Sequence, residues 1–159
     1  MITMLSLKKN LETEMNDSRI SREEMFMNIA KEVSRRSSCS RKHVGAALIL
    51  DNRIISIGYN GVLPGRPKSE GIDSDGVSHT VHAEANIIAF CARNGIATLD
   101  SILYVTLSPC DKCAELIKQA GIKKVVFSEL YRDTRGIEIL TENNVECHQY
   151  TKSYHANEN

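Results

Sequence analysis

Apolar positions in the first organised part of the chain recur at helical spacing. The recurring residues are Met25, Phe26, Ile29, Ala30 and Val33. Ser21, followed three residues later by Glu24, has the spacing of a capping box, which satisfies free N–H groups at a helix start. We therefore expect a helix over residues 21–36. Residues 1–20 keep no sustained period, so we expect an extension outside the core.

The next apolar runs alternate in the manner of β-strands. Two β-rich runs, over residues 44–50 and 53–59, are joined by Asp51 and Asn52, which predicts a hairpin. Residues 61–78 carry several glycines and prolines and few apolar side chains. This is the composition of a long surface loop, and loops of this length are often functional.

The second half of the chain alternates between the two periods. Helical patterns cover residues 81–94, 111–120 and 136–142, and the first two end at Gly95 and Gly121. Strand patterns cover residues 102–106, 125–127 and 145–149. Together these elements predict an α/β fold, a three-layer α/β/α sandwich built on a five-stranded mixed sheet.

Composition limits the class of protein. A chain of 159 residues is long enough for one substantial core, and 42% hydrophobic with 25% charged residues is close to the average for globular domains. These values exclude collagen-like, disordered and disulfide-scaffold classes. We expect one domain over residues 21–150, an N-terminal extension over 1–20 and a polar tail over 151–159.

Charge and cysteine content narrow the choice of partners and compartment. Twenty Lys and Arg balance twenty Asp and Glu, so no global positive field would gather DNA or RNA, and we expect a small substrate and no nucleic acid. No run approaches about 18 apolar residues and no signal peptide is recognisable, which predicts a cytoplasmic protein without membrane contact. Without a secretion signal, the five cysteines are expected in metal or core roles.

Two short motifs carry the candidate chemistry. His82 stands at the start of one predicted helix, and Cys110 and Cys113 stand at the start of another. Two helix starts can face one point, and two thiolates with one imidazole make a three-ligand zinc site that leaves one position open, as catalytic zinc sites do. Bound zinc lowers the pKa of water to about 7, so hydroxide is available at neutral pH.

Glu84 lies two residues beyond His82 and is predicted to be the proton shuttle beside that water. A Cys-x-x-Cys pair in an α/β chain also occurs as a redox pair. The combination with His-x-Glu upstream, however, is the signature of zinc deaminases that act on nucleobases. Cys39 and Cys91 are expected to pack in the core.

The two motifs, read as 82-HAEAN-86 and 108-SPCDKCA-114, resemble those of the cytidine deaminase superfamily. Within it, 44-VGA-46, 58-GYNG-61, 80-TVHAE-84, 104-YVTLSPC-110 and 131-YRD-133 resemble deoxycytidylate (dCMP) deaminases. The similarity covers roughly residues 26–149. It implies a cytidine deaminase-like fold, one catalytic Zn²⁺ and conversion of dCMP to dUMP and ammonia, with hydroxide attacking C4 of the base while Glu84 protonates N3.

The resemblance also implies which residues bind the substrate. They are Asn60 on the ribose, Ser40, Arg41 and Arg132 near the phosphate, and Val81, Ala83, Ser108 and Tyr131 around the base and nucleotide. For Asn60 a turn-forming role in Tyr59-Asn60-Gly61 is the alternative. For the arginines the alternative is a solvated surface charge, as for their neighbours Arg35, Arg36, Lys42 and Arg135.

Members of this family are commonly hexamers, activated by dCTP and inhibited by dTTP with Mg²⁺. The implied effector residues are Gly58, Asn60, Gly61 and Gly65, although the loop after them is shorter than in many relatives. Some members hold a second zinc through Cys and His residues, some of which lie in that loop. Here the loop has no cysteine, and Cys39 and His79 are too few, so we expect a single zinc and a homo-oligomer, with a hexamer favoured.

Two other functions stay open at this point. The same metal core serves deaminases of tRNA adenosine, guanine and free cytidine, and preference for a phosphate would discriminate among them. A catalytically silent nucleotide-binding homologue is the second alternative, and the presence of Glu84 argues against it, because a silent protein needs no proton shuttle.

Overall fold

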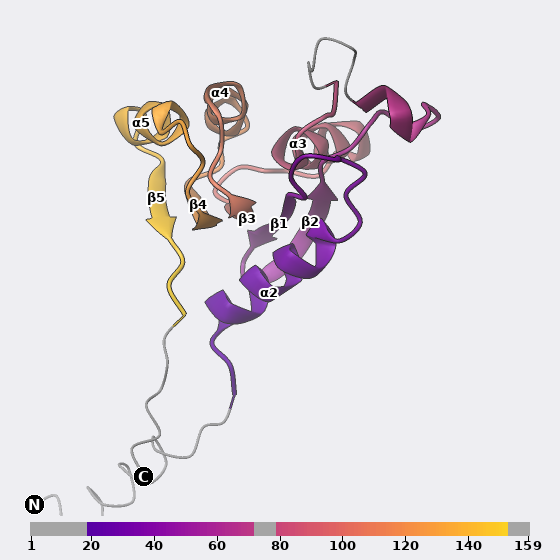
Figure 1. The fold of residues 1–159 in the computed structure, drawn as a ribbon. Helices are drawn as coiled ribbons and strands as arrows, with labels where there is room; N and C mark the ends of the chain where they lie inside the picture. Colours follow the sequence, from indigo (N-terminus) through magenta and orange to yellow (C-terminus); the bar gives the residue numbers. More distant parts are fainter. Residues whose placement is uncertain (1–18, 72–78, 153–159) are drawn as a thin grey trace, which may run out of the picture.

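The computed structural model describes residues 19–71 and 79–152. In this part of the chain the helices and strands follow the expected order, with one 3₁₀ turn, η1, in the long loop (Figure 1). Their bounds are α2 Arg22–Ser34, β1 Gly45–Leu50, β2 Arg53–Tyr59, η1 Lys68–Gly71, α3 Ala83–Asn94, β3 Ile102–Leu107, α4 Asp111–Gln119, β4 Lys124–Glu129, α5 Arg135–Glu142 and β5 Glu146–Gln149. The expected extension over 1–18, the loop segment 72–78 and the tail end 153–159 lie outside the described residues.

Local signals explain where these elements begin and end. The Ser21 hydroxyl accepts a hydrogen bond of 3.0 Å from the Glu24 N–H, so α2 has the expected N-terminal cap. Asp51 and Asn52 both have positive φ, at 48° and 59°, which is the backbone of the tight hairpin turn between β1 and β2. Gly95 ends α3 in the left-handed region, at φ 65°.

Within the described ranges the strands form one five-stranded sheet in the order β2-β1-β3-β4-β5. β1 pairs antiparallel with β2 and β3, while β3, β4 and β5 are parallel to one another. Figure 1 shows α3, α4 and α5 on one face and α2 on the other. The structure thus confirms the predicted three-layer sandwich and its mixed sheet.

The core consists of two apolar clusters, one on each face of the sheet. Leu103 and Val105 of β3 join the larger cluster, which also contains Ile87 of α3 and Ile117 of α4. Tyr104 points to the opposite face and packs on Phe26 of α2, with ring centroids 5.3 Å apart. This alternation follows from the two-residue period of a strand.

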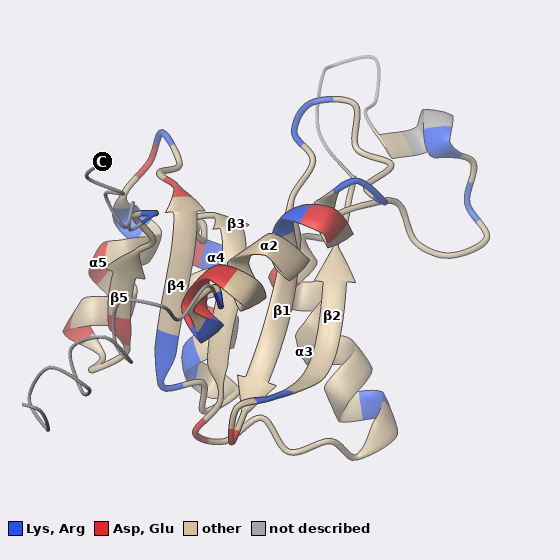
Figure 2. Ribbon diagram, turned by 90° about the horizontal axis from the view of Figure 1, so that it is seen from below, with Lys and Arg blue, Asp and Glu red and all other residues tan. Residues whose placement is uncertain are grey.

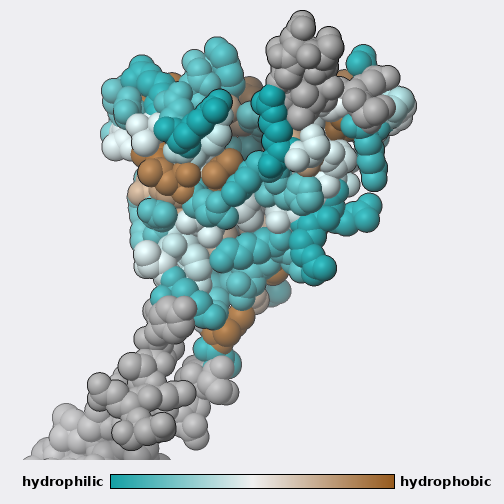
Figure 3. All heavy atoms as spheres, in the orientation of Figure 1, coloured by the Kyte–Doolittle hydropathy of each residue, from teal (hydrophilic) through white to brown (hydrophobic). Residues whose placement is uncertain are grey.

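The surface is mixed in charge and polarity. Figure 2 shows acidic and basic residues interspersed on α2, while β1 and β3 at the centre of the sheet carry no charged residue. On the face drawn in Figure 3, hydrophilic residues predominate and hydrophobic ones gather in small separate areas. None of the described helices combines the length and the hydropathy that a membrane span requires.

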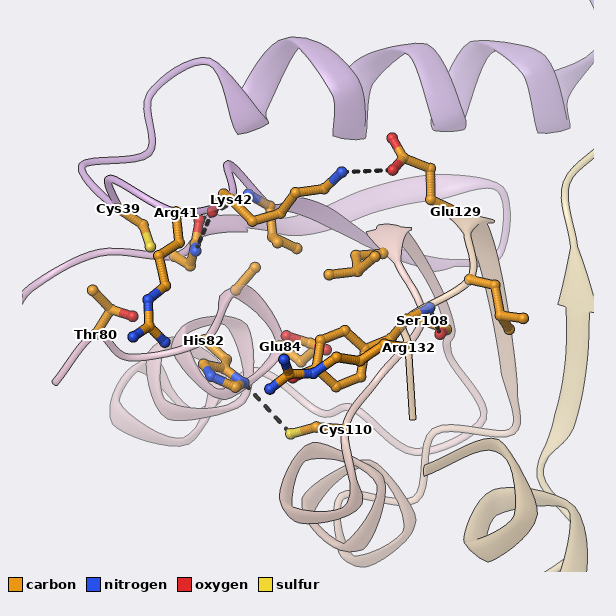
Figure 4. A pocket seen from close by; sticks show the side chains of 16 residues that line it. Cys39, Arg41, Lys42, Thr80, His82, Glu84, Ser108, Cys110, Glu129 and Arg132 are labelled. Carbon is orange, nitrogen blue, oxygen red and sulfur yellow. Dashed lines mark hydrogen bonds and ion pairs between the residues drawn. The ribbon is translucent and has the colours of Figure 1, made fainter. Parts of the chain in front are cut away.

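The topology determines where a site can form. β3 and β4 are parallel, so their carboxyl ends meet at the same edge of the sheet. Ser108 to Cys110 follow β3 directly, and Leu130 to Arg132 follow β4. The N-terminus of α3 reaches the same edge, as Figure 4 shows for His82 and Glu84 beside Ser108 and Cys110.

Candidate metal centre and active site

Three predicted ligands meet where the N-termini of α3 and α4 converge. His82 is the N-cap residue of α3, Cys110 is the N-cap residue of α4, and Cys113 lies in the first turn of α4. Neither N-cap side chain makes the usual capping hydrogen bond. The side chains at these two caps are therefore not used in capping and can act as ligands, and the helix dipoles favour anionic thiolates there.

The distances fit a tetrahedral zinc ion. His82 Nδ1 lies 3.5 Å from Cys110 Sγ and 3.4 Å from Cys113 Sγ. Ordinary Zn–N and Zn–S bond lengths at a tetrahedral angle would separate these atoms by about 3.5 Å. Among the described residues, these three form the one group of His, Cys, Asp or Glu whose ligand atoms all lie within 4.8 Å of one another. The donor set therefore fits zinc in both chemistry and spacing.

The electrostatics of the three groups favour a cation between them. Hydrogen bonds from Cys113 and then from His82 lower the pKa of the Cys110 thiol to about 4. The same contact with Cys110 raises the pKa of His82, and the bond to Cys110, followed by burial, raises the pKa of Cys113. Cys110 is thus a thiolate at neutral pH. A divalent cation can replace the protons of the hydrogen bonds that His82 and Cys113 make to it.

Glu84 lies in the first turn of α3 and is only 4% exposed. Burial raises the pKa of its carboxyl group, against hydrogen bonding to its own backbone N–H and the charge of His82. A carboxyl group with a raised pKa holds a proton more readily than an exposed one, as a group that accepts and returns protons must. Its position beside the ligand cluster is the one that a proton shuttle requires.

A cavity of about 440 Å³ opens beside these residues and is lined by His82, Glu84 and Cys110. Figure 4 shows Arg41 and Arg132 pointing into it from opposite sides. Cys113 is buried and does not line the cavity, so the cluster faces the cavity through His82 and Cys110. The cavity can hold a small ligand in contact with both the ligand cluster and the two cations.

The cavity brings together most of the residues that the sequence predicted for substrate binding. Asn60, Arg41, Ala83, Ser108, Tyr131 and Arg132 line it. Ser40 and Val81 are not in its lining; Ser40 is exposed, and Val81 pairs through its backbone with Gly61, in two hydrogen bonds of 2.8 and 3.1 Å. Ser108 accepts a hydrogen bond of 2.7 Å from the Tyr131 N–H, which holds the segment after β4 against the segment after β3.

Sequence reasoning missed several residues of this cavity. Lys42 and Glu129 both line it and form an ion pair of 2.6 Å between the segment before β1 and the end of β4 (Figure 4). Cys39, expected in the core, is buried but also borders the cavity, as does Thr80. The basic run around Arg41 was a signal for Lys42, whereas no local pattern pointed to Glu129.

Asn60 has a structural role in addition to lining the cavity. Its Oδ1 accepts hydrogen bonds from the Val44 N–H at 2.8 Å and from the Ser37 hydroxyl at 2.6 Å, and its Nδ2 donates to the Lys42 carbonyl at 2.8 Å. The side chain is 5% exposed. It therefore fixes the segment that carries Arg41 and Lys42 at the cavity mouth.

Asn60→Ala is expected to lower the free energy of unfolding by about 2–4 kcal/mol, because the buried Val44 N–H and the Lys42 carbonyl lose their partner. Urea denaturation followed by circular dichroism measures this loss. The control is Asn94→Ala, which removes one exposed hydrogen bond to Phe90 and should change the stability by less than about 0.5 kcal/mol. Similar values for both variants would contradict the structural role of Asn60.

The residues predicted to bind effectors lie around the turn after β2. Gly58 packs on α3, where a Cβ would lie 2.8 Å from the Ala83 carbonyl oxygen, so its small size has a packing reason. A Cβ on Gly61 would meet the Ser38 hydroxyl, and Gly65 has a φ of 87° in open space. Effector binding by these residues stays a prediction.

Comparison with known proteins gives the same picture. Residues 20–129 match the family described as the cytidine and deoxycytidylate deaminase zinc-binding region. The chain is 40% identical over 118 residues to ComE operon protein 2 of Bacillus subtilis, covering 72% of this chain but only 62% of that protein. It is 36% identical over 120 residues to the deoxycytidylate deaminase of Mycobacterium phage D29, covering 66% of this chain and 92% of that enzyme.

A solved structure extends the likeness to three dimensions. The dCMP deaminase of cyanophage S-TIM5, crystallised with dCMP and dUMP, superposes with a TM-score of 0.77 at 33% identity. The match covers 83% of this chain and all of that chain. The predicted resemblance in sequence and in fold is therefore confirmed.

Proposed function

Because the chain belongs to the cytidine and deoxycytidylate deaminase family, we propose that it hydrolyses dCMP to dUMP and ammonia. One observation carries this proposal. A buried carboxyl group, Glu84, lines one cavity together with His82 and Cys110, two of the three proposed zinc ligands, and the same cavity receives arginine side chains. The bound dCMP and dUMP of the cyanophage enzyme support the choice of substrate.

In the proposed reaction water adds to C4 of the cytosine ring, and the bond from C4 to the exocyclic nitrogen then breaks. Zinc held by the three ligands would supply Lewis-acid activation of water at neutral pH. Glu84 takes a proton from the water and places it on N3 of the ring. It then takes the proton of the hydroxyl group on C4 and passes it to the departing amine, which leaves as ammonia, and the ring becomes uracil.

The remaining cavity residues orient the nucleotide. We assign the backbone groups of Ala83 and Ser108 to the base, and the second N–H of the Asn60 amide to the deoxyribose. Ser40, Val81 and Tyr131 stay predicted contacts. Ser108 and Ala83 are buried, so their backbone groups next to the ligand cluster are rigidly held. A rigid arrangement of this kind presents C4 to the water without further reorganisation.

Arg41 and Arg132 are proposed as the ligands of the 5′-phosphate. Both line the cavity, and the exposed Lys42 adds a third cation near them. Arg132 lies over the Tyr131 ring, 5.7 Å from its centroid, which orients its guanidinium group. Lys42 forms an ion pair with Glu129. We assign the phosphate to the two arginines because a guanidinium group can bind a phosphate through two parallel hydrogen bonds.

The proposal is tested by following ammonia release and the change in ultraviolet absorption with dCMP, deoxycytidine, dCTP, guanine and adenosine in parallel. We expect dCMP to be preferred over deoxycytidine by about 10- to 100-fold in kcat/KM, as one or two charge-assisted hydrogen bonds would give. In Arg132→Ala the KM for dCMP should rise until most of this preference is lost, while turnover of deoxycytidine stays within about twofold.

Arg135→Ala is the matched control, because Arg135 is exposed and pairs with Glu138 at 3.2 Å outside the cavity lining. It should leave both substrates unaffected. An equal loss on dCMP and deoxycytidine in Arg132→Ala would refute the phosphate assignment. Faster turnover of guanine or adenosine than of dCMP by the unaltered protein would refute the proposed substrate.

Several finer points are part of the proposal. The activity is assigned to a single domain over residues 21–150. We also propose activation by dCTP, inhibition by dTTP with Mg²⁺ and a hexameric assembly, on the resemblance of the 58-GYNG-61 segment and of the chain as a whole to this family. A cytoplasmic location stays a prediction. Adding dCTP and dTTP to the substrate assays tests the regulation directly.

A further inference from the structure

Gly136 lies near the start of α5 and is buried against the backbone that carries a proposed zinc ligand. A Cβ at this position would lie 2.0 Å from the Pro109 carbonyl oxygen and 2.8 Å from the Cys110 carbonyl carbon. Both contacts are with backbone atoms, which cannot move aside as the end of a flexible side chain can. The close approach of α5 to Pro109 and Cys110 therefore requires a glycine.

The segment that Gly136 contacts sets the position of the ligand. Cys110 has an extended backbone, with φ −74° and ψ 172°, and it is the N-cap residue of α4. Pro109 is fully buried and has a fixed φ. A shift of this segment would move Cys110 Sγ away from His82 Nδ1, which lies 3.5 Å from it.

We propose that Gly136 is a positioning residue for the metal centre. The first turn of α5 supports the Pro109–Cys110 peptide from behind and holds the Cys110 thiolate at the distance from His82 that zinc requires. This inference rests on the proposed metal site and not on the identity of the substrate. A side chain at position 136 would push the Cys110 backbone toward the cavity and weaken zinc binding.

An ordinary packing role of the glycine would have a different consequence. Such a role would lower the stability of the fold and leave zinc affinity unchanged. A residue that acts on the ligand must change zinc affinity and coordination geometry as well. In a helix without the collision, Gly→Ala would be neutral or stabilising by up to about 1 kcal/mol, because alanine has the higher helix propensity. A loss of stability or of zinc affinity in Gly136→Ala would therefore not be caused by helix propensity.

The matched control is Gly45→Ala. A Cβ on Gly45 would lie 2.2 Å from the Ala30 carbonyl oxygen, a backbone collision as severe as that at Gly136. Gly45 faces α2, however, on the side of the sheet opposite to α3 and α4. Both variants thus introduce a Cβ that collides with backbone atoms. Only the collision at Gly136 displaces the segment that carries a proposed zinc ligand, Cys110.

The experiment measures zinc affinity by competition with a chromophoric chelator, and coordination by the visible absorption of the Co²⁺-loaded protein. In Gly136→Ala we expect zinc affinity to fall by at least about tenfold, in the range known for residues that support metal ligands, with an altered thiolate-to-cobalt absorption. Gly45→Ala should keep the affinity and spectrum of the unaltered protein. Unchanged affinity and spectrum in Gly136→Ala would overturn the proposal.

A second measurement covers the case in which the variants are only marginally folded. Zinc raises the melting temperature of any variant that binds it, in proportion to the logarithm of the ratio of its concentration to the dissociation constant. At one zinc concentration the rise should be smaller in Gly136→Ala than in Gly45→Ala, and equal rises would overturn the proposal. If the unaltered protein binds zinc but does not deaminate dCMP, the proposed function fails and this comparison still stands.

Discussion

Glu84→Gln is expected to reduce the turnover of dCMP by about a thousandfold or more, while zinc content and nucleotide binding should stay near those of the unaltered protein. The amide has nearly the same shape as the carboxyl group, and Glu84 is buried and is not among the three proposed ligands, so the site keeps its packing. What is lost is the group that takes and returns protons, a contribution of about 10²–10⁴ in rate for general acid–base catalysis alone.

Three measurements separate this role from others. Steady-state kinetics give kcat, elemental analysis gives the zinc content, and calorimetry gives the affinity for dUMP. Glu115→Gln, an exposed acidic residue on α4, is the control and should retain full turnover. Turnover above a tenth of the normal rate in Glu84→Gln, or loss of the zinc, would contradict the assignment of Glu84 as the proton shuttle.

Cys113→Ser is expected to lower zinc affinity by more than about 100-fold and to abolish deamination at ordinary zinc concentrations. Cys113 Sγ is buried and lies 3.4 Å from His82 Nδ1, so the substitution removes one of the two thiolates of the cluster. A hydroxyl group is a far poorer zinc ligand than a thiolate, and the remaining two protein ligands cannot hold the ion. The bound metal also stabilises the fold, so the melting temperature should fall with it.

Cys147→Ser provides the control for this variant. Cys147 is a half-buried free cysteine in β5 that packs against the core and is not part of the ligand cluster. It should keep its zinc and its activity, with only a small loss of stability. If Cys113→Ser retained one equivalent of zinc with normal affinity, the three-ligand assignment would be wrong.

The course of the backbone followed from local patterns in most of the chain. The capping residue Ser21, the Asp51-Asn52 turn and the left-handed Gly95 each act on their own neighbours, and each appears where it was expected.

The small differences between the predicted and the observed ends of the elements have local causes too. The helix predicted from residue 81 begins at Ala83 because His82 occupies the extended N-cap position, and α2 ends at Ser34 two residues early. The 3₁₀ turn at Lys68–Gly71 is too short to produce a periodic pattern of apolar residues in the sequence.

The grouping of the three proposed metal ligands was predictable for a similar reason. Cys110 and Cys113 are three residues apart at the start of one helix, and this spacing places their side chains on the same side of the helix. Their meeting with His82 was inferred from the known combination of motifs, and the distances of 3.4 and 3.5 Å agree with it. For Asn60 the sequence suggested a ribose contact or a turn, and the network with Lys42 and Val44 was not foreseen.

The helices and strands, the proposed zinc ligands and the proposed role of Glu84 could be predicted from the sequence, because these depend on neighbours a few residues away and on the chemistry of each side chain. Which distant residues meet follows from the tertiary fold alone. Lys42 and Glu129 are 87 positions apart and pair across the cavity, and Gly136 abuts Pro109 from another helix. These contacts depend on the strand order β2-β1-β3-β4-β5 and on the packing of α5 beside α4, which no local pattern encodes.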